Sequence, residues 1–394
     1  MGTAGIICEY NPMHSGHMKH IEETKRRLDC AIVCVMSGNF VQRGDFAVFS
    51  KHARAETAVK AGADLVLELP TPYVLSSAEG FAKAGVYILD QLGICDYISF
   101  GSESGDIEDL KTAADALALD ETDTLTKEWL NQGLPYAQAR QKAAEAVLGP
   151  KAALILTPNN LLGIEYIKAI YALGTTMTPM TVKREGDAHD SATGVSGSAL
   201  RKMLAFGKRP WSYMPQTAAL VCIEALKAGR APVLMKAGEL AMLSRLRGMS
   251  EADFAQLPGA VEGLDKRFFR YAATAPTVET ILEKVKTKRY AMSRLRRMLL
   301  CACLGITAED SAKPPPYLRV LAMNGVGREL LRDIGKRTTL PIITKPASAH
   351  ELPARARELF YKEAAATDFY ALAYPNEKQR AGAQEWTISP RVVE

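Results

Sequence analysis

GIICEYNPMHSGH, from Gly5 to His17, is the stretch of sequence that decides the fold. The apolar residues Ala4 to Cys8 predict a buried strand, because the chain-breaking pair Asn11-Pro12 follows them closely. A helix is expected to begin near Ser15. The turn between strand and helix therefore lies at the carboxyl end of a strand. Open α/β sheets bind ligands there, and a helix N-terminus favours an anion such as a phosphate.

Two histidines, His14 and His17, stand in this turn with Gly16 between them. Imidazole N–H groups can stabilise the charge that develops on an α-phosphate as pyrophosphate leaves, and a glycine lets the backbone approach phosphates closely. The alternative is that the histidines only cap the helix or bind a metal. The strand before the turn and the helix after it favour a nucleotide site.

Strands and helices alternate along the first 210 residues. After the first strand, short apolar strands are expected at 31–36, 64–69, 97–100 and 180–183, with helices near 19–28, 50–62 and 78–92. This alternation predicts an α/β fold, a doubly wound parallel five-stranded Rossmann-like sheet in a domain of residues 1–210. A helical insertion is expected at about 106–148. Residues 211–394 show apolar residues at helical spacing and predict a second, mainly helical domain.

The composition is that of an ordinary chain of two or three domains. It has 394 residues, of which 47% are apolar and 24% charged, and a net charge of +5. The seven cysteines are scattered, and we expect them to be reduced thiols of a cytoplasmic, monomeric protein without a zinc site. The sequence shows neither a charged-then-apolar leader nor an apolar run long enough to span a bilayer, so we expect no membrane partner.

Two further motifs follow later predicted strands. Ser196, Ser198 and Arg201 mark a helix start after the fifth strand, where two hydroxyls and a cation could hold the β- and γ-phosphates of a nucleotide. Gly101 follows the fourth strand and would leave space for adenosine.

Arg184 and a pair of asparagines are also candidate ligands of a nucleotide. Arg184 ends the fifth predicted strand and could contact a phosphate or base, or pair with Glu185 or Asp187. Asn159 or Asn160 could cap the helix that begins there, or could contact the ribose or the base.

A basic run without acidic residues lies in the second half of the chain and is expected to lie on a helix. A face without compensating carboxylates favours a polyanion, most simply the phosphates of RNA. Nearby aromatics at 268, 269 and 271 could stack on bases, although core packing is the commoner use of such residues. The candidate tRNA-binding residues of the run are Lys284, Lys286, Lys288, Arg289, Arg294, Arg296 and Arg297.

Together these motifs resemble the HIGH-type nucleotidyltransferases, whose first signature is HxGH and whose second carries hydroxyls and an arginine. Within that superfamily the chain is similar to the bacterial tRNA(Met) cytidine acetate ligases. The similarity lies in residues 5–17, 36–44, 100–103, 159–166 and 287–290, so it covers most of the chain. One departure is Gly197, where alanine is expected.

The resemblance implies that ATP and acetate, with Mg²⁺ as the aiding metal, form acetyl-AMP and pyrophosphate. The acetyl group then passes to N4 of the wobble cytidine of elongator tRNA(Met). The implied catalytic residues are His14, His17, Ser198 and Arg201. The implied ATP site consists of Ile7, Cys8, Glu9, Tyr10, Asn11, Pro12, Met13, His14, Ser15, Gly16, His17, Met18, Lys19, His20, Gly101, Asn159 and Arg184.

Two other functions remain open from the residues alone. A small-molecule adenylyltransferase would share the first half of the chain but has little need of a basic helical half. A non-catalytic RNA-binding protein with a relic nucleotide site would not need both histidines, Ser198 and Arg201 to be intact.

Overall fold

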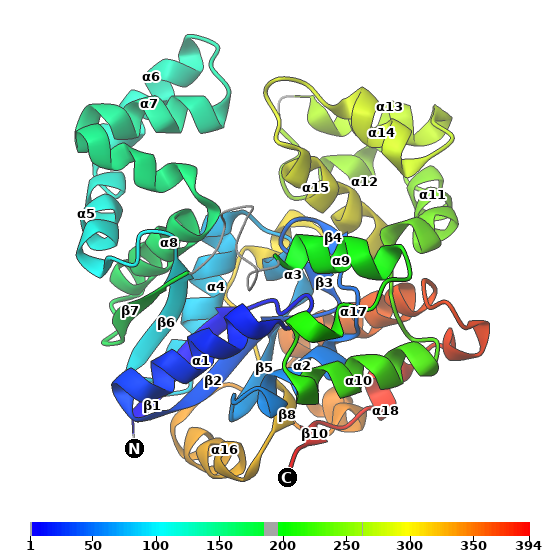
Figure 1. Cartoon of the computed structure of the whole chain (residues 1–394). Coiled ribbons are helices and arrows are strands. Elements are labelled where there is room, and N and C mark those ends of the chain that lie inside the picture. Colours follow the sequence, from blue (N-terminus) through cyan, green and yellow to red (C-terminus); the bar gives the residue numbers. More distant parts are fainter. Residues whose placement is uncertain (1, 185–195, 262) are drawn as a thin grey trace.

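A single eight-stranded sheet organises the computed structural model, which describes residues 2–184, 196–261 and 263–394 (Figure 1). The strand order is β10-β8-β5-β2-β1-β6-β7, with β9 paired to β8. Strands β5, β2, β1, β6 and β7 run parallel, so β1 lies at their centre. The strands are β1 Gly2–Cys8, β2 Cys30–Ser37, β5 Leu65–Leu69, β6 Tyr97–Ser102, β7 Thr178–Lys183, β8 Leu318–Met323, β9 Ile342–Ile343 and β10 Arg391–Val392, and a separate hairpin is formed by β3 Phe40–Val41 and β4 Asp45–Phe46.

Helices cover both faces of the sheet, as the alternation of strands and helices predicts. The helices of the first half are α1 Ser15–Leu28, α2 Lys51–Lys60, α3 Thr71–Val74, α4 Ala78–Gln91, α5 Ile107–Leu117, α6 Asp120–Asn131, α7 Tyr136–Leu148, α8 Pro158–Leu173 and α9 Gly197–Ala205. Those of the second half are α10 Gln216–Lys227, α11 Glu239–Arg247, α12 Glu251–Ala255, α13 Leu264–Thr274, α14 Val278–Val285, α15 Met292–Leu304, α16 Gly325–Arg337, α17 Ala354–Ala371 and α18 Gln384–Thr387.

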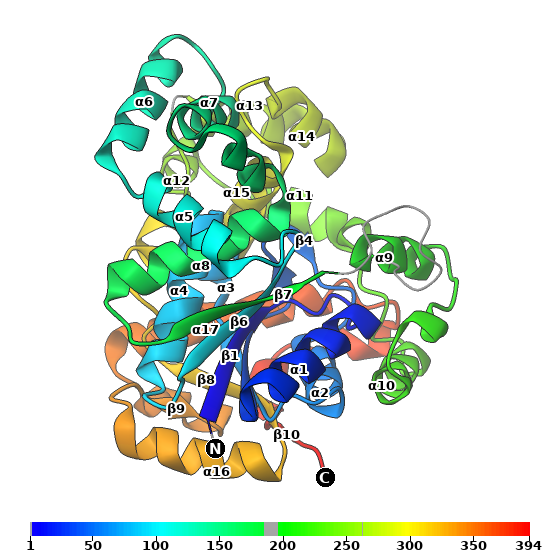
Figure 2. The ribbon, with the colours of Figure 1, turned by 60° about the vertical axis from the view of Figure 1, so that its left-hand side comes forward.

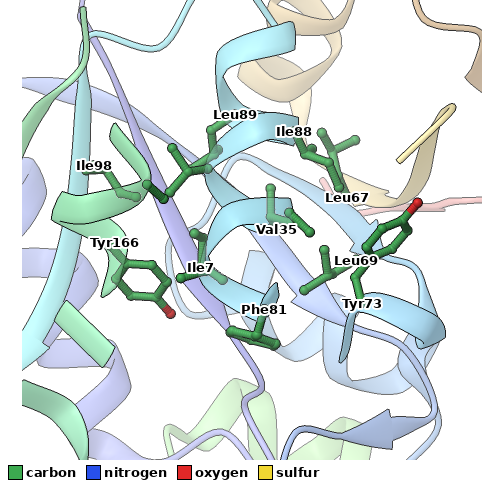
Figure 3. Packing of buried hydrophobic residues seen from close by; sticks show 14 of the residues in the cluster. Ile7, Val35, Leu67, Leu69, Tyr73, Phe81, Ile88, Leu89, Ile98 and Tyr166 are labelled. Carbon is green, nitrogen blue, oxygen red and sulfur yellow. The ribbon is translucent and has the colours of Figure 1, made fainter. Parts of the chain in front are cut away.

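Alternate residues of the central strands enter two different cores. Ile7, Val35 and Leu67 pack with α4 and α8 on one face (Figure 3), whereas Ile6 and Cys34 pack with α1 and α2 on the other. Side chains of a strand point to opposite faces in turn, and these strands are buried on both faces. This explains why they read as unbroken apolar runs in the sequence.

The five parallel strands are confirmed, and the sheet is wider than predicted. Strands β8, β9 and β10 come from residues after 210, so the expected boundary at 210 does not coincide with the edge of the sheet. β8 lies antiparallel to β5. A buried ion network lies at this join: Lys51 of α2 contacts Glu68 of β5 at 2.8 Å and Glu385 of α18 at 2.6 Å, and Glu385 contacts Arg319 of β8 at 3.2 Å. Sequence patterns show neighbours in the chain and could not reveal this contact over more than 300 residues.

Two groups of helices rise beyond the carboxyl edge of the sheet (Figures 1 and 2). Helices α5–α7 form one group and confirm the helical character predicted for residues 106–148. Helices α11–α15 form the other, and the aromatic rings of the β3–β4 hairpin pack into its core beside α17. The hairpin therefore joins this second group to the sheet.

The expectation of one basic helix over residues 284–297 is wrong. Helix α14 ends at Val285, residues 286–291 form a connection, and α15 begins at Met292. Tyr290 is buried within the connection and packs into the core of this helical group. The positive charges are thus spread over the end of one helix, a turn and the start of the next.

Candidate active site

The two histidines of the first turn cap helix α1. His14 is the N-cap, and its Nδ1 accepts the backbone N–H of Gly16 at 3.1 Å. In the reverse direction, His17 Nδ1 accepts the backbone N–H of His14 at 3.3 Å. A backbone N–H can only donate, so both Nδ1 atoms are unprotonated. Each neutral ring therefore carries its proton on Nε2, where it can be donated to a ligand.

Burial keeps both rings neutral. Their planes stack with centroids 3.6 Å apart, and His14 is only 7% exposed. Burial, with the charges of Arg184 and Arg201, lowers the pKa of His14 to about 4. Burial, His14 and Arg184 hold the pKa of His17 well below its usual value. The two histidines can thus cap the helix and bind a phosphate at the same time, because capping uses Nδ1 whereas Nε2–H would donate to the phosphate.

His20 also carries its proton on Nε2, but it donates this proton to a protein group and leaves Nδ1 unprotonated. Thr24 Oγ1 donates to the carbonyl of His20 at 2.8 Å, so the contact of Thr24 with Ser99 Oγ, also at 2.8 Å, uses the proton of Ser99. Ser99 must then accept from His20 Nε2–H at 2.9 Å. Burial, together with the charge of Arg184, lowers the pKa of His20 to about 4. His20 therefore presents an acceptor, Nδ1, to whatever lies beside it.

These depressed pKa values make the stability of the chain depend on pH. Between pH 6.5 and about 4 the unfolded chain binds protons that folded His14 and His20 do not, so the free energy of unfolding falls as the pH is lowered through this window. Each residue contributes a slope of up to about 1.4 kcal/mol per pH unit. In His14→Asn the amide oxygen can still cap α1, and we expect a shallower pH dependence. Denaturant unfolding from pH 7 to 4.5 measures this, and equal slopes for both proteins would contradict it.

The second motif lies against the first. Ser196 Oγ accepts the N–H of Ala199 and caps α9, and Arg201 Nη1 donates to the carbonyl of Asn11 at 2.7 Å. Ser198 is exposed in the first turn of α9. A Cβ on Gly197 would lie 3.5 Å from the Asn11 carbonyl, which is an ordinary contact, so alanine would also fit there. The fold thus brings together two motifs that are about 180 residues apart.

Gly101 and Arg184 lie next to each other on β6 and at the end of β7. Gly101 pairs with Val182, and a Cβ on Gly101 would lie 3.2 Å from Cγ of Arg184. The aliphatic part of the Arg184 side chain therefore covers the glycine, and its exposed guanidinium is close enough to the histidines to lower their pKa values. Glu185 and Asp187, its suggested ion-pair partners, lie outside the described residues.

Neither asparagine of the third motif caps α8, so that expectation is wrong. The N-cap is Thr157, and the helix N-terminus is instead satisfied by the carboxylate of Glu103, which accepts from the backbone N–H of Asn159 at 3.3 Å and of Asn160 at 2.8 Å. The Asn160 side chain is buried and accepts from the backbone N–H groups of Glu103 and Ser104. Asn159 is only partly buried, and its side-chain amide donates to Oε1 of Glu103 at 2.6 Å.

Several side chains of the implied ATP segment are structural. Ile7, Cys8, Tyr10 and Met13 pack into the two cores beside the sheet, so only their backbone can face a nucleotide. The reason is that this segment is both the central strand and the start of the turn. Polar members are also engaged by protein groups: Asn11 Oδ1 accepts from Val48 N at 2.9 Å, and Ser15 Oγ donates to the carbonyl of Tyr213 at 2.9 Å. Pro12 is buried, while Met18 is partly buried and Lys19 is exposed.

The candidate tRNA-binding residues differ in how they are held. Arg294 donates to the carbonyl of Gly259 at 3.3 Å, and Arg297 donates to the carbonyl of Gln42 in the hairpin at 3.3 Å. Phe268 is buried in the core of this helical group, which favours core packing over base stacking for this residue. The exposed residues of the set are Lys284, Lys286, Lys288, Arg289 and Arg296.

Arg54 lies near the site and is not among the residues predicted from the sequence. It is fully buried, and its guanidinium donates to the carbonyls of Ser37 at 3.0 Å and Phe49 at 3.1 Å, and to those of Gly38 and Glu9. It thereby ties together the carboxyl ends of β1 and β2. Arg54 shares one helical face with Ala55 and Ala58, and this spacing is a signal that could have shown it to face inward.

The described residues contain no group of three or more histidines, cysteines, aspartates or glutamates arranged to hold a metal ion. Mg²⁺ in nucleotide sites is held mainly by phosphate oxygens and water, with one or two carboxylates from the protein. Among the helices of the described ranges, none combines the length and the apolar character that crossing a membrane requires.

Comparisons with known proteins agree with this geometry. The model of the HIGH Nucleotidyl Transferase family matches residues 1–385. A tRNA(Met) cytidine acetate ligase of Caldanaerobacter subterraneus subsp. tengcongensis is 38% identical over 95% of this chain and 96% of its own length. A tRNA(Met) cytidine acetate ligase of Acetivibrio thermocellus is 36% identical over 98% of this chain and 99% of its own length. The crystal structure of Thermotoga maritima TmcAL bound with alpha-thio ATP superposes on this structure with a TM-score of 0.91. The match covers 100% of both chains, whose sequences are 32% identical.

Proposed function

The chain belongs to the HIGH nucleotidyltransferase family and, within it, to the tRNA(Met) cytidine acetate ligases, and we propose that it acetylates tRNA in two steps. ATP and acetate first give acetyl-AMP and pyrophosphate. The acetyl group is then transferred to N4 of the wobble cytidine of elongator tRNA(Met). The observation that carries this proposal is the contact of Arg201 with the Asn11 carbonyl, because it joins both phosphate-binding motifs in one site.

In the first step an acetate oxygen attacks the α-phosphate, so no protein nucleophile is required. The Nε2–H groups of His14 and His17 are donors positioned to stabilise the charge that develops on the phosphates. Ser198 and Arg201, at the N-terminus of α9, hold the departing pyrophosphate. Mg²⁺ bound to the phosphates would neutralise part of their charge.

Adenosine is proposed to lie over β6 and β7, beside Gly101 and Arg184, with Asn159 near its ribose or base. The Nδ1 atom of His20 is an acceptor and suits a hydroxyl or a guanidinium on this side of the site better than a phosphate oxygen. The basic residues at the end of α14, in the 286–291 connection and in α15 are proposed to bind the anticodon stem, with the wobble base unstacked to reach the adenylate. The monomeric state and the cytoplasmic location stay predictions.

Pyrophosphate exchange into ATP tests the proposal. We expect exchange that requires acetate, and acetylation of bulk tRNA at a cytidine when both substrates are present. Exchange with a mononucleotide acceptor but not with acetate would instead identify a small-molecule adenylyltransferase. Absence of any ATP turnover, together with tRNA binding, would identify a relic site.

A further inference from the structure

The two sides of the central strand β1 have different partners at the carboxyl edge of the sheet. On one side are β6 and β7 with Gly101 and Arg184, which the proposed function assigns to adenosine. On the other side are β2, the β3–β4 hairpin and, beyond it, the basic helix α15. With the phosphates between them at the histidine turn, the acceptor cytidine has to approach from the β2 side.

Glu9 is the carboxylate on that side. It directly follows β1 and precedes the histidine turn. Its Oε1 accepts the backbone N–H of Gln42 at 2.6 Å, and the carbonyl of Gln42 accepts from Arg297 of α15 at 3.3 Å. One hairpin residue, Gln42, therefore separates Glu9 from Arg297 and the basic side chains of α15. Among the described residues none donates a hydrogen bond to Oε2, and the side chain is partly exposed.

We propose that Oε2 of Glu9 accepts the proton from N4 of the cytidine during acetyl transfer, an inference that rests on the proposed function. The N4 lone pair forms the new bond to the acetyl carbon. The bond between this carbon and the phosphate oxygen breaks, and its electron pair leaves with AMP. The N4 proton passes to Oε2, so that neutral N4-acetylcytidine, AMP and a protonated Glu9 remain. Glu9 is then a catalytic residue of the second step only.

The surroundings of Glu9 suit a base that works near neutral pH. Burial raises the pKa of Glu9, which brings it nearer to neutrality. The N–H of Gln42 and the charges of three arginines oppose this rise, because they stabilise the ionised carboxylate: Arg54 of α2, Arg201 of α9 and Arg43 of the hairpin. Tyr166 of α8 also faces this region, with a pKa raised by burial and by the charge of Glu9. Oε1 is fixed by Gln42, so Oε2 has a defined position.

The test separates the two steps in the whole protein. Glu9→Gln keeps an oxygen for the Gln42 N–H but removes the base, and we expect acetyl transfer from preformed acetyl-AMP to tRNA to slow by about 100-fold in single turnover. Acetate-dependent pyrophosphate exchange should fall by much less. The transfer rate of the wild-type protein should rise with pH through the pKa of Glu9. This dependence of the rate on pH should be absent in E9Q. Asp45→Asn is the matched control, because Asp45 is another partly exposed carboxylate whose pKa is raised by burial, and this variant should transfer at the wild-type rate.

Equal losses of exchange and transfer in E9Q would overturn the proposal and assign Glu9 to nucleotide binding, and an unchanged transfer rate would overturn it as well. If E9Q does not fold, Glu9→Asp withdraws the carboxylate by one methylene. This variant should transfer more slowly than the wild type, but its transfer rate should still rise with pH. A transfer rate that no longer depends on pH in Glu9→Asp would contradict the proposal. Absence of acetate-dependent exchange in the wild-type protein would refute the proposed function instead.

Discussion

His17→Ala is expected to lower acetate-dependent pyrophosphate exchange by about 10²- to 10³-fold, the usual cost of removing one preorganised donor from a developing charge. The ring of His17 stacks on His14 and carries its proton on Nε2, because Nδ1 accepts the N–H of His14. Alanine removes that donor and also one of the two reciprocal caps of α1. Binding of tRNA should remain close to that of the wild type, because the basic surface lies on α14 and α15.

His17→Asn separates the donor from the cap. The amide oxygen of asparagine can take the place of Nδ1 and accept the N–H of His14, but nothing then replaces Nε2–H. We therefore expect H17N to unfold at nearly the wild-type denaturant concentration and yet to exchange as slowly as H17A. An H17N protein with wild-type exchange would show that His17 serves only as a cap.

Replacing Lys284, Lys288 and Arg296 by alanine is expected to weaken tRNA binding by roughly 10- to 100-fold at physiological salt, since each phosphate contact contributes by counterion release. All three side chains are exposed. The slope of log affinity against log salt concentration should decrease in magnitude by about 2 to 3. Acetate-dependent exchange does not involve tRNA and should persist. Filter binding over a salt series, beside the exchange assay, measures both quantities.

A matched control lies at the opposite end of the molecule. Arg328, Arg332 and Lys336 are exposed on α16, beyond the amino edge of the sheet (Figure 1), and their replacement by alanine removes the same three charges. We expect this variant to bind tRNA almost as the wild type does. Equal losses in the two triple variants would mean that net charge, rather than the surface formed by the end of α14, the 286–291 connection and α15, governs tRNA binding.

The sequence predicted the parallel core because residues 4–8 and 31–36 are continuous apolar runs and because short strands alternate with helices along the first half of the chain. It predicted too small a sheet, since β9 and β10 are two residues long and β8 lies in a mainly helical region. The basic run was placed on one helix because charge spacing gives no information on where a helix ends. The buried Tyr290 breaks that run, and its burial depends on packing against residues far away in the chain.

By itself the sequence determined the turn from Gly5 to His17, its place at the carboxyl end of the first strand and the family to which the chain belongs. These features depend on residues close together in the chain, where propensity and spacing act directly. Only the tertiary structure decided which imidazole nitrogens carry protons, that Arg201 reaches the Asn11 carbonyl, and that Glu9 lies one hairpin residue from α15. Those facts depend on hydrogen bonds between distant segments, which only the packed chain brings together.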